Sequence, residues 1–202
     1  LQTPAIALAQ LIKEMSYMLE VAQRALDKAM DNFINRTEDE EPVRKDLREI
    51  NFLSGKVTDY LIRLSEEDMS HNDELTVSSL YKVLSDIMRV ADFSNNIMRY
   101  LRVAVANELY FSSEGLNEIK EMYSLVDELF KDVDYTFANR TTRLLAKIED
   151  TESKTDKFKL QLQQNHLDRL KGGNCKSESS SLYVNLIGNI ERVADHPVYI
   201  AH

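Results

Sequence analysis

The sequence has few residues that interrupt helices. It contains three prolines, five glycines and no tryptophan in 202 residues, of which 43% are hydrophobic. Because proline and glycine are the residues least compatible with a helix interior, this composition indicates a mostly helical soluble protein. The single cysteine, Cys175, cannot form an internal disulfide, which fits a reducing compartment. The sequence has neither a signal-peptide pattern nor a run of about 20 apolar residues that could span a membrane.

Basic residues are also in the minority. The chain has 25 Lys and Arg against 34 Asp and Glu, which gives a formal net charge of −9. Nucleic acids and anionic membrane surfaces attract positive charge, so this balance argues against both as partners and suits cations better. The chain begins with Leu1 and not with Met, which favours a piece cut from a longer protein.

Apolar residues recur every three to four positions over most of the chain and predict six long helices. Thr3 and Pro4 are typical of a helix start. Short connections between long helices favour antiparallel neighbours. The expected helices cover residues 3–35, 43–64, 72–110, 116–137, about 141–170, and the segment after 177–181. In the fifth helix the predicted apolar stripe is weak and consists of Ile148, Phe158, Leu162, Leu167 and Leu170.

Two short strings occur twice. Arg-Val-Ala-Asp stands at 89–92 and again 103 residues later at 192–195, and Ile-Lys-Glu-Met stands at 12–15 and 107 residues later at 119–122. Arg-Leu at 63–64 and 169–170, 106 residues apart, falls between them. Repetition at a near-constant spacing indicates an internal duplication. The sequence therefore predicts an all-α fold of two tandem three-helix bundles, residues 1–111 and 112–202, separated at Ser112–Gly115.

Paired carboxylates occur in the second repeat. Glu191 and Asp195 lie one turn apart on or beside the apolar stripe of the last helix, where two like charges are unfavourable unless an arginine or a metal ion compensates them. Glu152 and Asp156 form a second such pair on the fifth helix. If the two pairs face each other, four carboxylates make an oxygen-rich site for iron, manganese, zinc or another divalent cation. The alternative is that Glu152 and Asp156 face water beside Lys154, Lys157 and Lys159.

The first repeat retains only part of this pattern. Met88 and Ile50 replace two of the acids, and the thioether of a methionine is a poor ligand for a hard cation. Any metal site in the first repeat is therefore expected to be weaker or absent. Alignment on the repeated strings matches Asp92 with Asp195, Met88 with Glu191, Asp46 with Glu152, and Ile50 with Asp156.

The string Glu191-Arg192-Val193-Ala194-Asp195-His196, followed by Ile200-Ala201, resembles the PhoU family of phosphate-transport regulators, whose signature is Glu/Asp-x-x-x-Asp. Residues 92–97 resemble a degraded first copy. Tyr199 and Pro197 depart from the usual pattern. Residues 166–175 look more like the version fused to the C-terminus of bacterial sodium/phosphate cotransporters than the free-standing regulator.

The resemblance implies a cytosolic, non-enzymatic regulatory domain that tunes phosphate uptake. At the inner face of the cell membrane it would contact a membrane-embedded phosphate transporter, in the same chain or as a partner, without inserting into the membrane. It also implies that metal (iron, zinc or manganese) is bound by Glu191, Asp195, Glu152 and Asp156, with Asp92 in the first repeat. The sequence leaves the oligomeric state open, a homodimer included.

Two other functions stay open at this point. One is the free-standing regulator of an ABC-type phosphate transporter and its sensor kinase. The other is a carboxylate-bridged metal oxidase, an enzyme class that uses Glu-x-x-His pairs on bundle helices. The sequence contains no Glu followed by His three residues later, which disfavours the oxidase.

Overall fold

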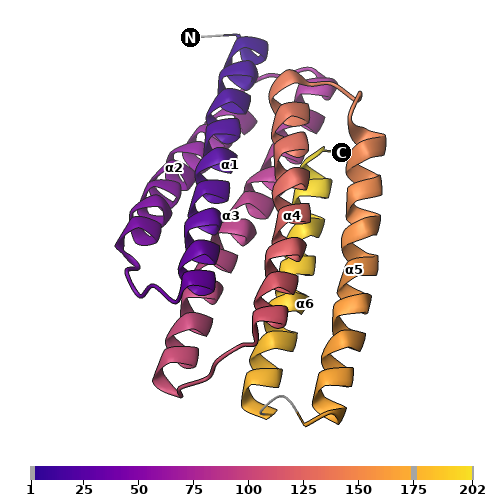
Figure 1. Ribbon diagram of the computed structural model, residues 1–202. Helices are drawn as coiled ribbons and strands as arrows, with labels where there is room; N and C mark the ends of the chain where they lie inside the picture. The colour runs from indigo at the N-terminus through magenta and orange to yellow at the C-terminus, as the bar shows by residue number, and fades with distance from the viewer. Residues whose placement is uncertain (1–2, 174–176, 202) are drawn as a thin grey trace.

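The computed structural model describes residues 3–173 and 177–201, which form six helices joined by short connections (Figure 1). Cys175 lies outside the described residues, as do the side chains from His196 onward. The described residues contain no strand, so the predicted all-α fold is confirmed. None of the described helices is both long and apolar enough to cross a bilayer. The helices are α1 (Pro4–Asn35), α2 (Glu41–Ser65), α3 (His71–Ala106), α4 (Ser113–Asn139), α5 (Leu145–Lys171) and α6 (Ser177–Ala201).

Three helices begin at capping side chains. The hydroxyls of Thr3, Ser70 and Ser112 each accept a hydrogen bond from the backbone N–H three residues later, at 3.4, 3.2 and 3.0 Å. Such a cap satisfies one of the amides that the first turn leaves free. The predicted start at Thr3 is confirmed. Ser113–Gly115, expected in the boundary between the repeats, instead belong to the first turn of α4.

Two further helix boundaries differ from the prediction. Helix α3 ends at Ala106 and not near residue 110, because Glu108 adopts a left-handed conformation with φ of 53°. Helix α5 begins at Leu145, a few residues later than expected. Arg140, at φ of 49°, ends α4, and the Thr141 hydroxyl then accepts the Arg143 N–H at 3.2 Å in a turn. Local side-chain and backbone conformations of this kind leave no periodic signal in the sequence.

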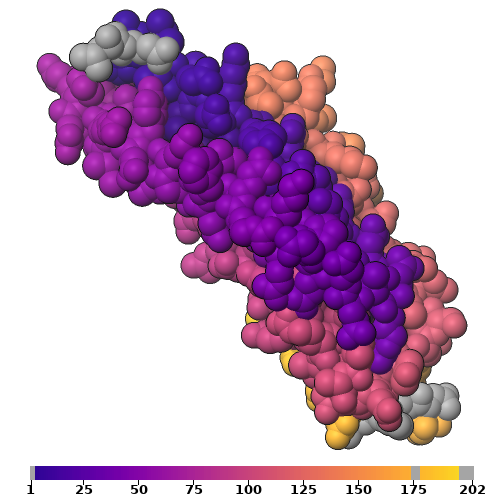
Figure 2. Space-filling view, turned by 90° about the vertical axis from the view of Figure 1, so that its left-hand side faces the viewer, coloured from indigo at the N-terminus to yellow at the C-terminus, as the bar shows by residue number. Residues whose placement is uncertain are grey.

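The two repeats pack along their long helices. Helix α1 packs against α4 and α3 against α6, so these four form the centre of the molecule. Helix α2 covers α1 and α3 on one side, and α5 covers α4 and α6 on the other (Figure 1). Figure 2 shows the resulting elongated shape from the α2 side. The core includes methionines of α1 and α4, and Met15, Met18 and Met122 are fully buried.

The seam between α1 and α4 records the duplication. Ser16 donates a hydrogen bond to Asp134 at 3.2 Å, and Tyr123 donates one to Asp27. Ser16 and Tyr123 are 107 residues apart, and so are Asp27 and Asp134, which is the spacing of the Ile-Lys-Glu-Met repeat. The same pair of positions therefore meets twice, in opposite directions. The repeats are related by an approximate two-fold axis through this antiparallel helix pair.

The buried face of α5 is more polar than predicted. Thr151, Thr155 and His166 are buried, whereas Leu167 is 49% exposed. The predicted apolar stripe was therefore wrong at Leu167. The buried face of α5 follows helical spacing, but polar residues occupy several of its positions. The two threonine hydroxyls donate to backbone carbonyls one turn earlier, at 2.9 Å each, which satisfies them inside the helix.

This burial pattern also corrects the alignment of α2 with α5. Five buried positions of each helix match at a spacing of 105 residues, not the 106 taken from Arg-Leu. Because side chains one position apart point about 100° apart on a helix, the shift matters. Leu47 and Asn51, and not Asp46 and Ile50, occupy the places of Glu152 and Asp156. The matched pairs are Val43 with Ile148, Asp46 with Thr151, Ile50 with Thr155, Val57 with Leu162, and Leu61 with His166.

Candidate metal centre

Four carboxyl groups meet where α5 packs against α6. The carboxyl of Glu152 forms a hydrogen bond with that of Asp195, and the carboxyl of Asp156 forms one with that of Glu191. Each helix contributes two acids one turn apart, and the antiparallel packing sets one pair opposite the other. The two pairs therefore face each other as the sequence predicted, while their role as metal ligands stays a prediction.

The spacing of the oxygens fits a single cation. One carboxylate oxygen from each of Asp156, Glu191 and Asp195 lies within 4.8 Å of the others. Divalent ions bind carboxylate oxygens at about 2.0–2.6 Å, so two oxygens on opposite sides of one ion are about 4–5 Å apart. Asp156 is exposed and the other two are half-buried, which leaves the group open to solvent on one side. The donor set is all oxygen, the chemistry that hard cations prefer.

Crowding of the four acids changes their proton affinity. Burial, the hydrogen bond with Asp195 and repulsion by the neighbouring acids raise the pKa of Glu152 to about 7. Burial, the hydrogen bond with Glu191 and the same repulsion raise the pKa of Asp156 to about 6. Protons therefore partly offset the negative charge near neutral pH. A metal ion would displace these protons on binding.

Lys159 contributes a positive charge to the same place. Its Nζ lies 3.1 Å from Oε2 of Glu191, and the two side chains are only 26% and 15% exposed. Lys154, on the same helix, instead pairs with Asp150 at 3.1 Å, where both side chains are about two-thirds exposed. Of these two lysines, which the sequence placed near Glu152 and Asp156, Lys159 points toward the acids of the centre and Lys154 points away from them.

The corresponding place in the first repeat is not acidic. Leu47 is buried, Asn51 is exposed and Met88 is half-buried, so one carboxylate, Asp92, stands where the second repeat has four. Asp92 is exposed and does not belong to the group of neighbouring ligand atoms found among the described residues. Its metal-binding role stays a prediction.

Asp46, which the sequence alignment had placed in this site, serves another purpose. It is buried and accepts hydrogen bonds from Arg24 at 2.9 Å and from Lys28 at 2.8 Å, both on α1. Two cations already neutralise its charge. Asp46 therefore ties α2 to α1.

Sequence reasoning missed a buried polar network at the far end of α5. Arg169 forms an ion pair with Glu118, whose second oxygen accepts a hydrogen bond from the Tyr183 hydroxyl at 2.5 Å. His166 stacks on Tyr183 with ring centroids 4.8 Å apart. His166 Nε2 also lies 2.5 Å from the Ser180 hydroxyl oxygen. The network joins α4, α5 and α6.

The first repeat fills the same positions with aliphatic side chains, all of them buried. The polar network is therefore a feature of the second repeat alone. A comparison of the two repeats position by position is the signal that could have revealed it from sequence. With the helix spacings of 107, 105 and 103 residues, the equivalents of Glu118, His166, Arg169, Ser180 and Tyr183 are Leu11, Leu61, Leu64, Val77 and Leu80.

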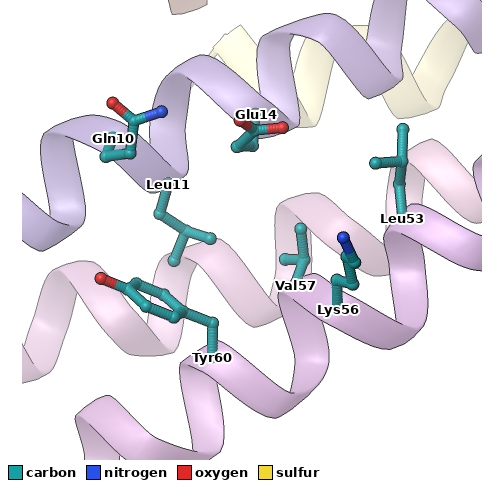
Figure 3. Close-up of a pocket in the computed structure, with 7 residues that line it drawn as sticks. All are labelled: Gln10, Leu11, Glu14, Leu53, Lys56, Val57 and Tyr60. Atoms are coloured by element: carbon teal, nitrogen blue, oxygen red, sulfur yellow. The ribbon is translucent and has the colours of Figure 1, made fainter.

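A separate hollow of about 270 Å³ lies between α1 and α2 (Figure 3). Glu14 of α1 and Lys56 of α2 line it together with apolar side chains of both helices. Its volume is at the lower limit of small-molecule pockets, roughly 300 Å³. Since it lacks a group of convergent ligands, the carboxylate centre is the stronger candidate site. The lining residues are Gln10, Leu11, Glu14, Leu53, Lys56, Val57 and Tyr60.

Comparison with known proteins settles the family. The family model described as PhoU domain matches residues 15–101 and 119–202, one match in each repeat. The chain belongs to the PhoU domain family. The predicted resemblance is confirmed at that level. All four acids of the candidate centre lie within the second matched segment of this PhoU domain, and Asp92 lies within the first.

Individual relatives agree with this assignment. The chain is 24% identical over 197 residues to a phosphate-specific transport system accessory protein PhoU homolog 1 from Thermotoga maritima, which covers 94% of this chain and 82% of that protein. The crystal structure of PhoU from Pseudomonas aeruginosa matches with a TM-score of 0.87 at 16% identity, over 98% of this chain and 95% of that one. The PhoU regulatory protein of the phosphate transport system from Streptococcus pneumoniae matches with a TM-score of 0.85 at 18% identity, over 98% and 93%. These structures share the fold, and the likeness to the cotransporter-fused version stays a prediction.

Proposed function

We propose that this PhoU domain regulates phosphate uptake by contacting a phosphate transport system and that it is not an enzyme. The observation that carries the proposal is the match of both repeats to the PhoU domain. The Thermotoga relative is described as an accessory protein of a phosphate-specific transport system, which favours the free-standing regulator of an ABC-type transporter. The likeness of residues 166–175 to the cotransporter-fused version supports a second candidate, a regulatory domain of a sodium-dependent phosphate transporter at the inner face of the membrane.

Uptake of labelled phosphate by cells that lack this chain tests regulation itself. Loss of the regulator should raise uptake when phosphate is plentiful, and the intact chain should restore restraint. Co-purification from cross-linked cells then separates the two candidates: an ATP-binding transporter subunit supports the first, and a sodium-coupled transporter the second. Unchanged uptake in cells lacking the chain would contradict both.

We also propose that the acids of α5 and α6 bind iron, zinc or manganese. Asp156, Glu191 and Asp195 would supply the ligands, with Glu152 held beside them by its hydrogen bond to Asp195. A bound ion would supply positive charge between the acids of α5 and those of α6 and would link the two helices through these ligands. This chain's own residues hold the four acids close together and keep one side open for the ion to enter.

Elemental analysis of untagged protein tests the metal. The matched variants are Glu191→Ala/Asp195→Ala and a control of equal charge change, Glu66→Ala/Glu67→Ala, at two exposed acids of the first repeat. We expect metal in the wild type and the control, and none in the first variant. A wild-type protein that stays metal-free after incubation with these ions would make the acids structural, and regulation would then act through protein contacts alone.

A further inference from the structure

We propose that Lys159 is a tethered cation that competes with metal for Glu191 and so sets the metal affinity of the centre. In the absence of metal its ammonium forms an ion pair with the Glu191 carboxylate, and this ion pair breaks when a metal ion binds. This inference rests on the metal binding proposed above.

The position of Lys159 supports the competition. It follows Asp156 by three residues on α5, so both side chains project from the same face of the helix toward α6. Its Nζ lies 3.1 Å from an oxygen of Glu191, one of the three acids whose oxygens lie close enough to share an ion. Both side chains are largely shielded from water, so this ion pair is less screened than a surface pair.

The ammonium and a divalent ion cannot share Glu191 without strong repulsion. An ion bound to that carboxylate would lie about 2.0–2.6 Å from its oxygen, within a few ångströms of the present Nζ position. Lysine has a flexible four-carbon stem, so Lys159 can swing out into water. Metal binding must then break the Lys159–Glu191 ion pair, and the loss of that pair weakens the net affinity.

Lys159 has the opposite effect on the metal-free protein. Its ion pair with Glu191 places the Lys159 ammonium beside four carboxyl groups that repel one another. Its charge therefore helps to hold α5 against α6 before metal arrives. Removing the charge should tighten metal binding and loosen the metal-free fold, a combination that a purely structural salt bridge does not produce.

Lys159→Met is the decisive variant, because it keeps most of the apolar stem and removes the charge. Lys154→Met is the matched control: it makes the same charge change on the same helix but breaks an exposed pair with Asp150. Titration calorimetry with Mn²⁺ and with Zn²⁺ on chelator-treated protein measures the Kd of each. We expect Lys159→Met to bind about tenfold more tightly, the effect of removing a partly buried charge-assisted hydrogen bond, and Lys154→Met to stay within about twofold of wild type.

Two further measurements strengthen the test. In chelator, Lys159→Met should unfold at a lower temperature than Lys154→Met, and saturating Mn²⁺ should remove or reverse that difference. Lys159→Arg, which keeps the charge, should return the affinity toward that of wild type.

The outcomes separate this inference from the proposed function. Equal Kd values for Lys159→Met and Lys154→Met, with metal bound by the wild type, overturn the role of Lys159 and leave the metal centre standing. A wild-type Kd about tenfold above that of Lys159→Met, with Lys154→Met close to the wild type, supports the competition. No binding by any of the proteins overturns both proposals.

Discussion

The buried network around Glu118 allows a test of why the second repeat has a polar core where the first has an aliphatic one. Glu118→Leu removes the acceptor of both Arg169 and Tyr183 and leaves a largely buried guanidinium and a buried hydroxyl. Removing one partner of a buried ion pair costs about 3–5 kcal/mol. The Arg169 side chain is 13% exposed and retains a second carboxylate, Glu114, at 3.6 Å, so we expect the lower end, about 3 kcal/mol.

The first repeat supplies the design of the compensating variant. Glu118→Leu/Arg169→Leu/Tyr183→Leu installs the side chains that Leu11, Leu64 and Leu80 present at the equivalent buried positions. Apolar replacement of a whole buried ion pair is often neutral or stabilising, so the triple variant should come within about 2 kcal/mol of wild type. Three substitutions are thus expected to cost less than one.

Urea unfolding followed by circular dichroism measures these free energies, with thermal scans beside it. For a chain of this size, the loss of about 3 kcal/mol lowers Tm by roughly 6–12 °C. The exposed acid of the same helix, Glu121→Leu, is the control and should change stability by no more than about 0.5 kcal/mol. A single Glu118→Leu cost below about 1 kcal/mol, or a triple variant that loses the sum of the single costs, would refute the reasoning.

Three further predictions concern pH, the seam between the repeats and local opening. Because the folded pKa of Glu152 is raised to about 7, its contribution to stability is present at low pH and is lost as pH rises through 7. Thermal scans from pH 5 to 8 in chelator should therefore show a shallower fall in Tm for Glu152→Gln than for wild type. Burial and Arg169 lower the pKa of His166, so this residue destabilises the fold as pH falls, by the same amount in wild type and in Glu152→Gln. Identical slopes of Tm against pH for the two proteins would contradict the raised pKa of Glu152. Tyr123→Phe, which removes the hydrogen bond to Asp27, should lower the free energy of unfolding in urea by about 1–2 kcal/mol, and no change would show that the seam does not depend on this bond. Hydrogen exchange without metal should be faster in the backbone of α5 than in that of α2, because its buried face is more polar; equal protection would exclude a weaker attachment of α5.

The fold was predictable because long amphipathic helices repeat one strong signal many times. Six helices, their order and the duplication follow from apolar spacing and from two repeated strings. The failures lie where a single residue decides the outcome. Glu108 ends α3 by adopting a left-handed conformation, and the buried Thr151 and Thr155 hide the true stripe of α5 from a reading based on hydrophobicity.

The candidate site was predictable only in part, for a geometric reason. The spacing of Glu191 and Asp195 places them one turn apart, and antiparallel packing sets the α5 pair opposite them. The alignment of α2 with α5 depended on one dipeptide, Arg-Leu, and was wrong by one residue. That error assigned Asp46 to the place of Glu152, whereas its side chain points toward α1. Contacts between distant segments, such as Lys159 with Glu191, have no counterpart in local spacing.

The two repeats share one backbone plan but hold their outer helices differently. Helix α2 is attached through aliphatic residues such as Leu61 and Leu64 and through a neutralised Asp46, none of which needs a bound ion. In the places of Leu61 and Leu64, α5 presents a histidine and an arginine. In the places of Leu47 and Asn51 it presents two acids that face two more on α6. Hydrophobic contacts do not depend on charge state, whereas a contact between two carboxyl groups becomes repulsive when their shared proton is lost and attractive again when a cation binds between them. A metal ion would therefore act on this PhoU domain where α5 meets α6, whereas α2 is held by contacts that need no bound ion.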